Sequence, residues 1–151
     1  MKKFCSVLMV LIVSFGMFAF SPTAQAAAKE TVAGIVATSS GRLNVRSAQS
    51  TSSSVVASLN KGSYVTLISQ TGSWWYVEYA DGRYGYCHAD YIRTVESDPA
   101  TVSTQSGNLN VRTGPGTSYA VADRLPKGGS VVVLSQSDGW SHILYNGTKT
   151  G

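Results

Sequence analysis

The sequence predicts an all-β protein built from two tandem copies of one small domain, and three observations support this. The chain repeats itself without a gap at an offset of 66 residues, so that Gly41–Arg46 matches Gly107–Arg112. Along 64–68 and 75–79, residues expected to face the core alternate with residues expected to face outward, and this period of two is that of a β-strand. Asp-Gly and Asn-Gly pairs separate such segments and favour tight hairpin turns, because these turns need positive φ.

The repeat extends through both copies. Further matches pair Leu59–Gly62 with Leu125–Gly128, and Trp74, Val77, Tyr79 and Gly85 with Trp140, Ile143, Tyr145 and Gly151. We predict a lead-in at 27–37, domain 1 at 38–93, a linker at 94–103 and domain 2 at 104–151. The counterpart of Tyr86–Ile92 is missing after Gly151. We therefore expect domain 2 to lack its final strand and the chain to be part of a longer protein.

The first 26 residues have the layout of a secretory signal peptide. A basic start at Met1–Lys3 precedes an apolar run at Val7–Phe20, and Ala24–Ala26 supplies small residues for cleavage. The alternative is a retained membrane anchor, but the run is shorter than the roughly 20 residues that span a bilayer. We predict a secreted, extracellular or cell-wall-associated protein with no stable membrane anchor after signal cleavage.

Charge and cysteine content exclude several function classes. The chain has 12 Lys and Arg against 8 Asp and Glu, and Lys2 and Lys3 belong to the predicted signal peptide. The remaining basic residues are scattered, whereas nucleic-acid binding needs a concentrated basic face, so we predict none. Cys87 is the one cysteine after the signal peptide, so no intramolecular disulfide is expected.

No residue set predicts catalysis, a metal site or a cofactor. Cys87 and His88 are neighbours on an expected strand, where adjacent side chains point to opposite faces. A cysteine nucleophile needs its histidine within hydrogen-bond reach, so we interpret Cys87 as a small buried core residue. Two isolated histidines, His88 and His142, do not make a zinc-ligand set.

Several motifs together resemble the bacterial SH3-type domain. These are the order Leu-Asn-Val-Arg, Leu-x-Lys-Gly, a valine-rich strand, Gly-Trp, and a final glycine, and Leu109–Ser118 is an especially close match. Ala48–Ser50 departs from the pattern, because Gly-Pro-Gly is expected there. The resemblance covers residues 38–151 and implies two small SH3-like β-barrels, the second without its final strand. It also implies an extracellular binding role, because family members are often attached to enzymes that cut peptidoglycan.

Polar residues that alternate with the core positions are the first ligand-binding candidates: Asn44 and Arg46, with their counterparts Asn110 and Arg112. In one interpretation the arginine meets an acidic or carbonyl group of a ligand. In the other, which we favour, each asparagine caps a turn and each arginine bonds a backbone carbonyl of its own domain.

Aromatic residues are the second set of candidates. Copy 1 has Trp74, Tyr76, Tyr84 and Tyr86, and copy 2 has Trp140 and Tyr145. Exposed rings suit sugar rings and peptide stems because they are flat and amphipathic. The two tryptophans alternatively seal one end of each domain, and Trp75, Val77 and Tyr79 are predicted to face the core.

We interpret the chain as a non-catalytic module that binds peptidoglycan or another polymer of the bacterial cell wall. Two linked weak sites would strengthen retention through effective concentration. One alternative is the N-terminal targeting fragment of a peptidoglycan hydrolase, an amidase or a cysteine peptidase, with its catalytic domain beyond residue 151. Another is an extracellular protein-interaction module.

Overall fold

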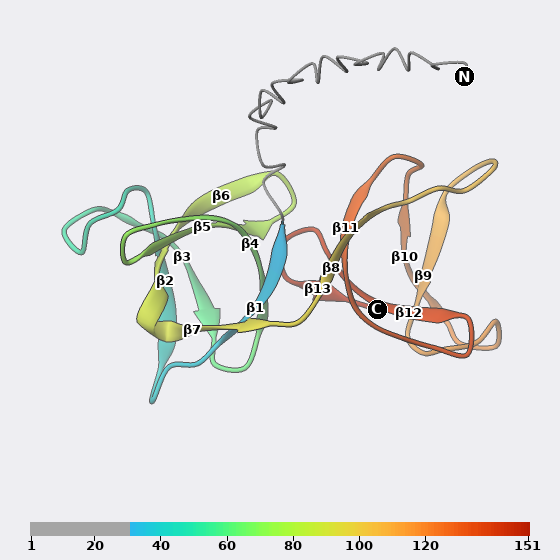
Figure 1. The fold of residues 1–151 in the computed structure, drawn as a ribbon, viewed down its shortest axis with the longest axis horizontal. Coiled ribbons are helices and arrows are strands. Elements are labelled where there is room, and N and C mark those ends of the chain that lie inside the picture. Colours follow the sequence, from blue (N-terminus) through green and yellow to red (C-terminus); the bar gives the residue numbers. More distant parts are fainter. Residues whose placement is uncertain (1–30) are drawn as a thin grey trace, which may run out of the picture.

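The computed structural model describes residues 31–151, which form two β-rich units side by side (Figure 1). The first unit, repeat 1, is a seven-stranded antiparallel sheet of order β3-β2-β6-β5-β4-β1-β7. Its elements are β1 (Val32–Val36), β2 (Arg42–Arg46), β3 (Val55–Asn60), β4 (Tyr64–Thr71), β5 (Trp74–Ala80), β6 (Arg83–His88), the 3₁₀ turn η1 (Ala89–Tyr91) and β7 (Ile92–Val95). The predicted signal peptide lies outside the described residues.

The core of repeat 1 follows from the two-residue period of its strands. Leu43 and Val45 point inward from β2, while Asn44 between them is exposed. Trp75 and Tyr79 pack against the core beside the fully buried Val77, as predicted. The core cluster consists of Val36, Leu43, Val45, Leu59, Val65, Leu67, Val77 and Cys87.

In the second unit, repeat 2, the strands follow one another along the chain as β1–β6 do in repeat 1. They form two separate sheets, β13-β12-β11-β8 and β10-β9. Its strands are β8 (Asp98–Thr101), β9 (Leu109–Arg112), β10 (Val121–Leu125), β11 (Ser130–Ser137), β12 (Trp140–Tyr145) and β13 (Lys149–Thr150).

The two sheets of repeat 2 are not joined to each other by paired strands, whereas repeat 1 forms a single sheet. In repeat 1, β6 joins the sheet halves through the pairing of Arg46 with Tyr86. The core is covered less well in repeat 2: Leu43 is 4% exposed, whereas its counterpart Leu109 is 38% exposed. The predicted all-β fold in two similar copies is confirmed.

The segments predicted as a lead-in (27–37) and a linker (94–103) differ from expectation, because they contain β1 and β8, the first strand of each repeat. Val36 and Val102 make the same two backbone hydrogen bonds. In repeat 1, the N–H of Val36 donates to the carbonyl oxygen of Ser63, and the N–H of Gly62 donates to the carbonyl oxygen of Val36. The residues at the matching positions of repeat 2 form the same pair of bonds. The polar β8 (DPAT) gave no strand signal, and β1 (VAGIV) is short and lies outside the part of the copies that was compared. Pairing with β4 or β11 orders them.

The two repeats pack against each other through an apolar contact, which we call the docking interface. Ala33 of β1, Val132 of β11 and Leu144 of β12 form its buried centre, with Tyr64, Val95 and Leu134 around them. The backbone N–H and the hydroxyl of Thr66 both donate to the carbonyl oxygen of Gly147, at 2.9 and 3.1 Å.

The turn at Gly147 fits closely against repeat 1. This residue has a φ of +82°, and a Cβ added to it would lie 2.6 Å from the backbone nitrogen of Ala80. A glycine is therefore required here for both conformation and space. Among the described residues, no helix is long and apolar enough to cross a membrane.

Candidate functional site

Strands β5 and β6 place a row of aromatic rings on the outer side of repeat 1. Their register sets Trp74 opposite His88, Tyr76 opposite Tyr86, and Glu78 opposite Tyr84. All six side chains share one face because the alternate residues of both strands point into the core. We call this surface, together with Tyr91 of η1, the aromatic face.

The rings of the aromatic face contact one another in two groups. Tyr76 stacks on Tyr84 with ring centroids 5.7 Å apart and lies 5.1 Å from Tyr86. His88 meets Trp74 edge-on at 5.2 Å and lies 5.8 Å from Tyr91. Contacts of this kind hold rings in fixed positions, so the face offers a preformed apolar platform with hydroxyl groups along it.

A groove of about 530 Å³ lies at the Trp74 end of the aromatic face. Trp74, His88 and Tyr91 form one side, and the other lining residues come from β2 and the loops beside it: Thr38, Ser39, Ser40, Arg42, Leu43, Asn44, Arg46 and Thr51. The groove therefore combines aromatic rings with hydroxyl groups and two cations.

The arginine candidates are held by their own domains. Arg46 donates to the carbonyl oxygen of Ser53 at 2.6 Å, and Arg112 donates to that of Tyr119 at 2.7 Å. This matches the interpretation that we favoured from the sequence, in which each arginine braces a loop. Arg46 still lines the groove, so its remaining N–H groups face the same space as Trp74.

The asparagine candidates also make cross-strand contacts. The side-chain oxygen of Asn44 accepts from the Ser58 hydroxyl at 3.1 Å, and that of Asn110 accepts from the Arg124 guanidinium at 3.2 Å. Asn44 lies in the groove, whereas Asn110 lies on the separate β9-β10 sheet of repeat 2.

Repeat 2 does not carry a second aromatic face. His142 stands at the position of Tyr76 and meets Tyr64 of repeat 1 edge-on at 6.5 Å, while Leu144 stands at the position of Glu78 and is buried in the docking interface. The surface that is open in repeat 1 is thus partly covered in repeat 2. The two copies therefore present different outward surfaces, and the expectation of two linked weak sites stays a prediction.

The structure also separates the remaining candidates of repeat 2. Tyr145 is 4% exposed and belongs to the core, at the position of the core-facing Tyr79, although it also lines a cavity beside Asn146. Burial is the first cause that raises the pKa of its hydroxyl. Trp140 is partly buried at the start of β12, apart from the aromatic face of repeat 1.

Sequence reasoning missed three members of the aromatic face as binding candidates: Glu78, His88 and Tyr91. The signal for the first two was present, because each alternates with core residues on its strand, as Tyr76 and Tyr86 do. Tyr91 gave no such signal, since it lies in the 3₁₀ turn after β6.

Electrostatics distinguish the outer face from the core. The Glu78 carboxylate, and to a smaller extent burial, raise the pKa of the Tyr84 hydroxyl. Cys87 is fully buried, as interpreted from the sequence, and burial raises the pKa of its thiol to about 12. Within residues 31–151, no group of three or more His, Cys, Asp and Glu side chains could hold a metal ion.

A family model described as a bacterial SH3 domain matches residues 41–93 and 107–151, one match in each repeat. The chain belongs to the bacterial SH3 domain family. These two matches confirm the tandem copies inferred from the internal repeat.

One curated relative of this bacterial SH3 protein is "Putative N-acetylmuramoyl-L-alanine amidase YrvJ" of Bacillus subtilis (strain 168). The two are 28% identical over 153 residues, which covers 96% of this chain and 28% of the relative, so the chain spans little more than a quarter of that protein. Solved structures with some likeness are NlpC2 and NlpC1 from Trichomonas vaginalis, at 14% and 16% identity and TM-scores of 0.40 and 0.38. They cover 80% and 84% of this chain and 45% of each of those chains.

Proposed function

We propose that this protein is a binding module for the bacterial cell wall, acts outside the cell, and holds peptidoglycan on the aromatic face of repeat 1. The observation that carries the proposal is the fixed row of rings from Trp74 to Tyr84 beside a groove. Sugar rings pack well on flat amphipathic side chains, and hydroxyl and guanidinium groups in the groove can bond their polar substituents. The relative named as an amidase supports the wall as the site of action.

A second candidate is that these repeats target a larger peptidoglycan hydrolase to its substrate. The match to a much longer amidase relative favours it, because the repeats align with only part of that protein. Both candidates require wall binding by the repeats themselves, so one experiment tests the shared step.

The test is co-sedimentation of residues 27–151 with purified, protein-free cell-wall sacculi. We expect the protein to pellet with the sacculi, and the double variant Tyr76→Ala, Tyr84→Ala to bind at least about tenfold more weakly, since central aromatic residues dominate such contacts. Tyr119→Ala is the matched control, because Tyr119 of repeat 2 is 48% exposed and Tyr84 is 46% exposed. Far-ultraviolet circular dichroism establishes that each variant is folded.

Two results would contradict the proposal in different ways. A folded double variant that pellets like the unmodified protein would place the site elsewhere. A folded, unmodified protein that stays in the supernatant would rule out wall binding, and proline-rich peptides would then test the remaining interpretation as a protein-interaction module.

A further inference from the structure

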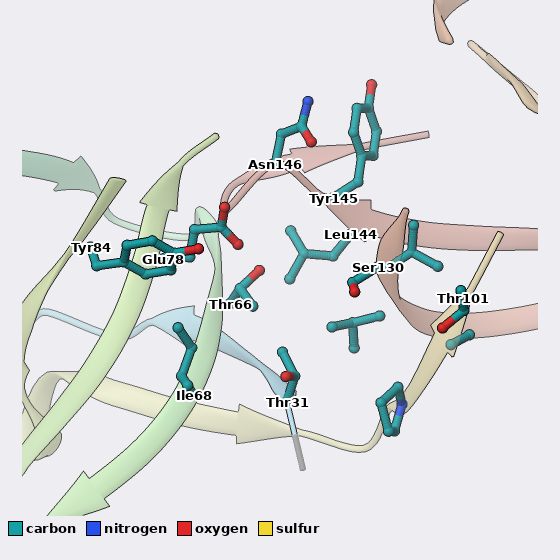
Figure 2. A pocket seen from close by; sticks show the side chains of 14 residues that line it. Thr31, Thr66, Ile68, Glu78, Tyr84, Thr101, Ser130, Leu144, Tyr145 and Asn146 are labelled. Carbon is teal, nitrogen blue, oxygen red and sulfur yellow. The ribbon is translucent and has the colours of Figure 1, made fainter. Parts of the chain in front are cut away.

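A cavity of about 350 Å³ lies between the two repeats, and we call it the cleft (Figure 2). Repeat 1 contributes Thr66, Ile68, Glu78 and Tyr84 on one side, and repeat 2 contributes Ser130, Leu144 and Asn146 on the other. Its volume falls within the range of about 300–1,000 Å³ that is usual for sites of small ligands. The cleft exists only while the repeats are docked, because its two walls belong to different domains.

The docking interface fixes the geometry of the cleft. Thr66 lines the cleft and is 5% exposed, and its backbone N–H and hydroxyl both bind the carbonyl oxygen of Gly147. Leu144 belongs to both the buried docking interface and the cleft wall. The two walls are therefore held by buried contacts and are not left to a flexible linker.

The cleft has one charged lining residue, Glu78. One of its carboxylate oxygens, Oε1, accepts the backbone N–H of Gly82 at 3.0 Å, which fixes the direction of the group. Among residues 31–151, no lysine or arginine forms an ion pair with it. The other groups in reach of a ligand are neutral: hydroxyls of Thr101 and Ser130, the Asn146 amide and the Tyr84 ring.

These features point to a cationic group as the ligand of the cleft. A carboxylate that is held in place, lacks a cation of its own and is partly shielded from water gains most from a charge-assisted hydrogen bond with an ammonium group. Neutral hydroxyl and amide groups on the facing wall suit the polar atoms of a peptide backbone. A metal ion is disfavoured, because one carboxylate is too few ligands for a hard cation.

We propose that the cleft binds a primary amine carried by a peptide segment of the wall polymer, with Glu78 as its counter-ion. This inference rests on the proposed function and extends it, because Tyr84 belongs to both the aromatic face and the cleft. A ligand lying along the rings reaches Glu78 at the end of the row. Leu144 takes the place of Glu78 in repeat 2, so repeat 2 has no matching carboxylate at this position.

The test compares two synthetic peptides by calorimetric titration of the purified protein. Both are tetrapeptides (L-Ala, D-γ-Glu, L-Lys, D-Ala) whose N-terminal α-amine is acetylated; the first has a free lysine ε-amine, and in the second the ε-amine is acetylated as well. We expect the free amine to bind at least about tenfold more tightly. Glu78→Gln should remove the difference, because the amide still accepts the Gly82 N–H but has no charge. Glu96→Gln is the matched control, since it removes one exposed carboxylate from the segment between β7 and β8.

Each outcome decides the inference separately from the proposed function. Equal affinity for both peptides, or no affinity for either, overturns the amine site, and the comparison with unmodified protein needs no variant to fold. Selectivity that survives Glu78→Gln also overturns it. If the protein binds sacculi without amine selectivity, wall binding stands and the cleft proposal fails; if it selects the amine without binding sacculi, the reverse holds.

Discussion

The buried thiol of Cys87 shows how a residue's surroundings set its chemistry. It is fully buried at the centre of the repeat 1 core, beside a histidine that points to the opposite face. Burial disfavours the thiolate, which raises the thiol pKa to about 12. Only the thiolate reacts well, so the native protein should be inert to thiol reagents.

We predict that Cys87 makes the protein less stable in alkaline solution. The thiol stays protonated in the folded state up to about pH 12 but ionises near 9.0 when unfolded, so the unfolded state binds fewer protons between these values. The free energy of unfolding should then fall by about 1.4 kcal/mol per pH unit above 9. Urea unfolding from pH 8 to 11 measures this slope, and Cys87→Ala should have a shallower one. An equal slope in both proteins would show that the thiol is not the cause.

For single residues, the sequence predicted which side chains face the core, but it did not predict which outward-facing side chains contact one another. Leu43, Val45 and Val77 are buried because a strand's period of two fixes their side of the sheet. The contact of Trp74 with His88 depends on the register between β5 and β6, and that of His88 with Tyr91 depends on the turn that follows. Neither is encoded in one strand's pattern, so the groove could not be found from the residues alone.

At the scale of elements, β6 crosses β2 at a point where only glycine fits. A Cβ on Gly85 would lie 2.5 Å from Cγ1 of Val45 and 2.9 Å from the carbonyl oxygen of Arg46. The same approach recurs in repeat 2, where a Cβ on Gly151 would meet Val111. The glycine shared by both copies is thus explained by close strand packing, as often happens for glycine within a strand.

We predict that Gly85→Ala destabilises repeat 1 by about 1–3 kcal/mol, the usual cost of forcing extra atoms into a packed core. Gly116→Ala is the control, because the three atoms nearest to its Cβ would all belong to side chains, the first of them 3.3 Å away in the Tyr119 ring. It should change the free energy of unfolding by less than about 0.5 kcal/mol. Equilibrium denaturation compares the two, and equal stability would contradict the packing explanation.

Strands β1 and β8 show what the sequence comparison could have found but did not. The match between copies continues upstream of the predicted domains, which begin at Thr38 and Thr104, to Val36 and Val102. Both threonines donate to the carbonyl of the glycine three residues later, at 3.2 and 2.8 Å. The two strands differ in composition: β1 (VAGIV) is apolar and partly buried, whereas β8 (DPAT) is mostly polar and exposed and is ordered by its pairing with β11.

For the whole molecule, the positions at which the two copies differ say more about how the repeats pack together than the positions that they share. Outward positions that are polar in repeat 1, Thr66 and Glu78, are Val132 and Leu144 in repeat 2. Apolar residues at outward positions need a cover, and repeat 1 provides it. This signal was available in the alignment of the two copies. The partner surface around Ala33 and Tyr64 was not, because nothing in the sequence indicates which face of repeat 1 meets them.

The docking interface leads to a last prediction, which uses a pair of glycines in repeat 2 with similar backbone conformations. Gly147 has a φ of +82° and Gly139 a φ of +77°, so alanine is strained at both. Only at Gly147 would the added Cβ clash across the interface, with Ala80, while Gly139 has no neighbour within 4 Å. Gly139→Ala should cost about 1 kcal/mol from backbone strain alone. Gly147→Ala should cost more stability and should also separate the repeats.

The sharpest readout is hydrogen exchange at the Thr66 amide, which donates to the Gly147 carbonyl and should lose protection in that variant alone. Small-angle scattering should show a larger radius of gyration. If the Thr66 amide stays protected in Gly147→Ala, the turn does not control docking, and the cleft would have to be held by the apolar contact around Leu144.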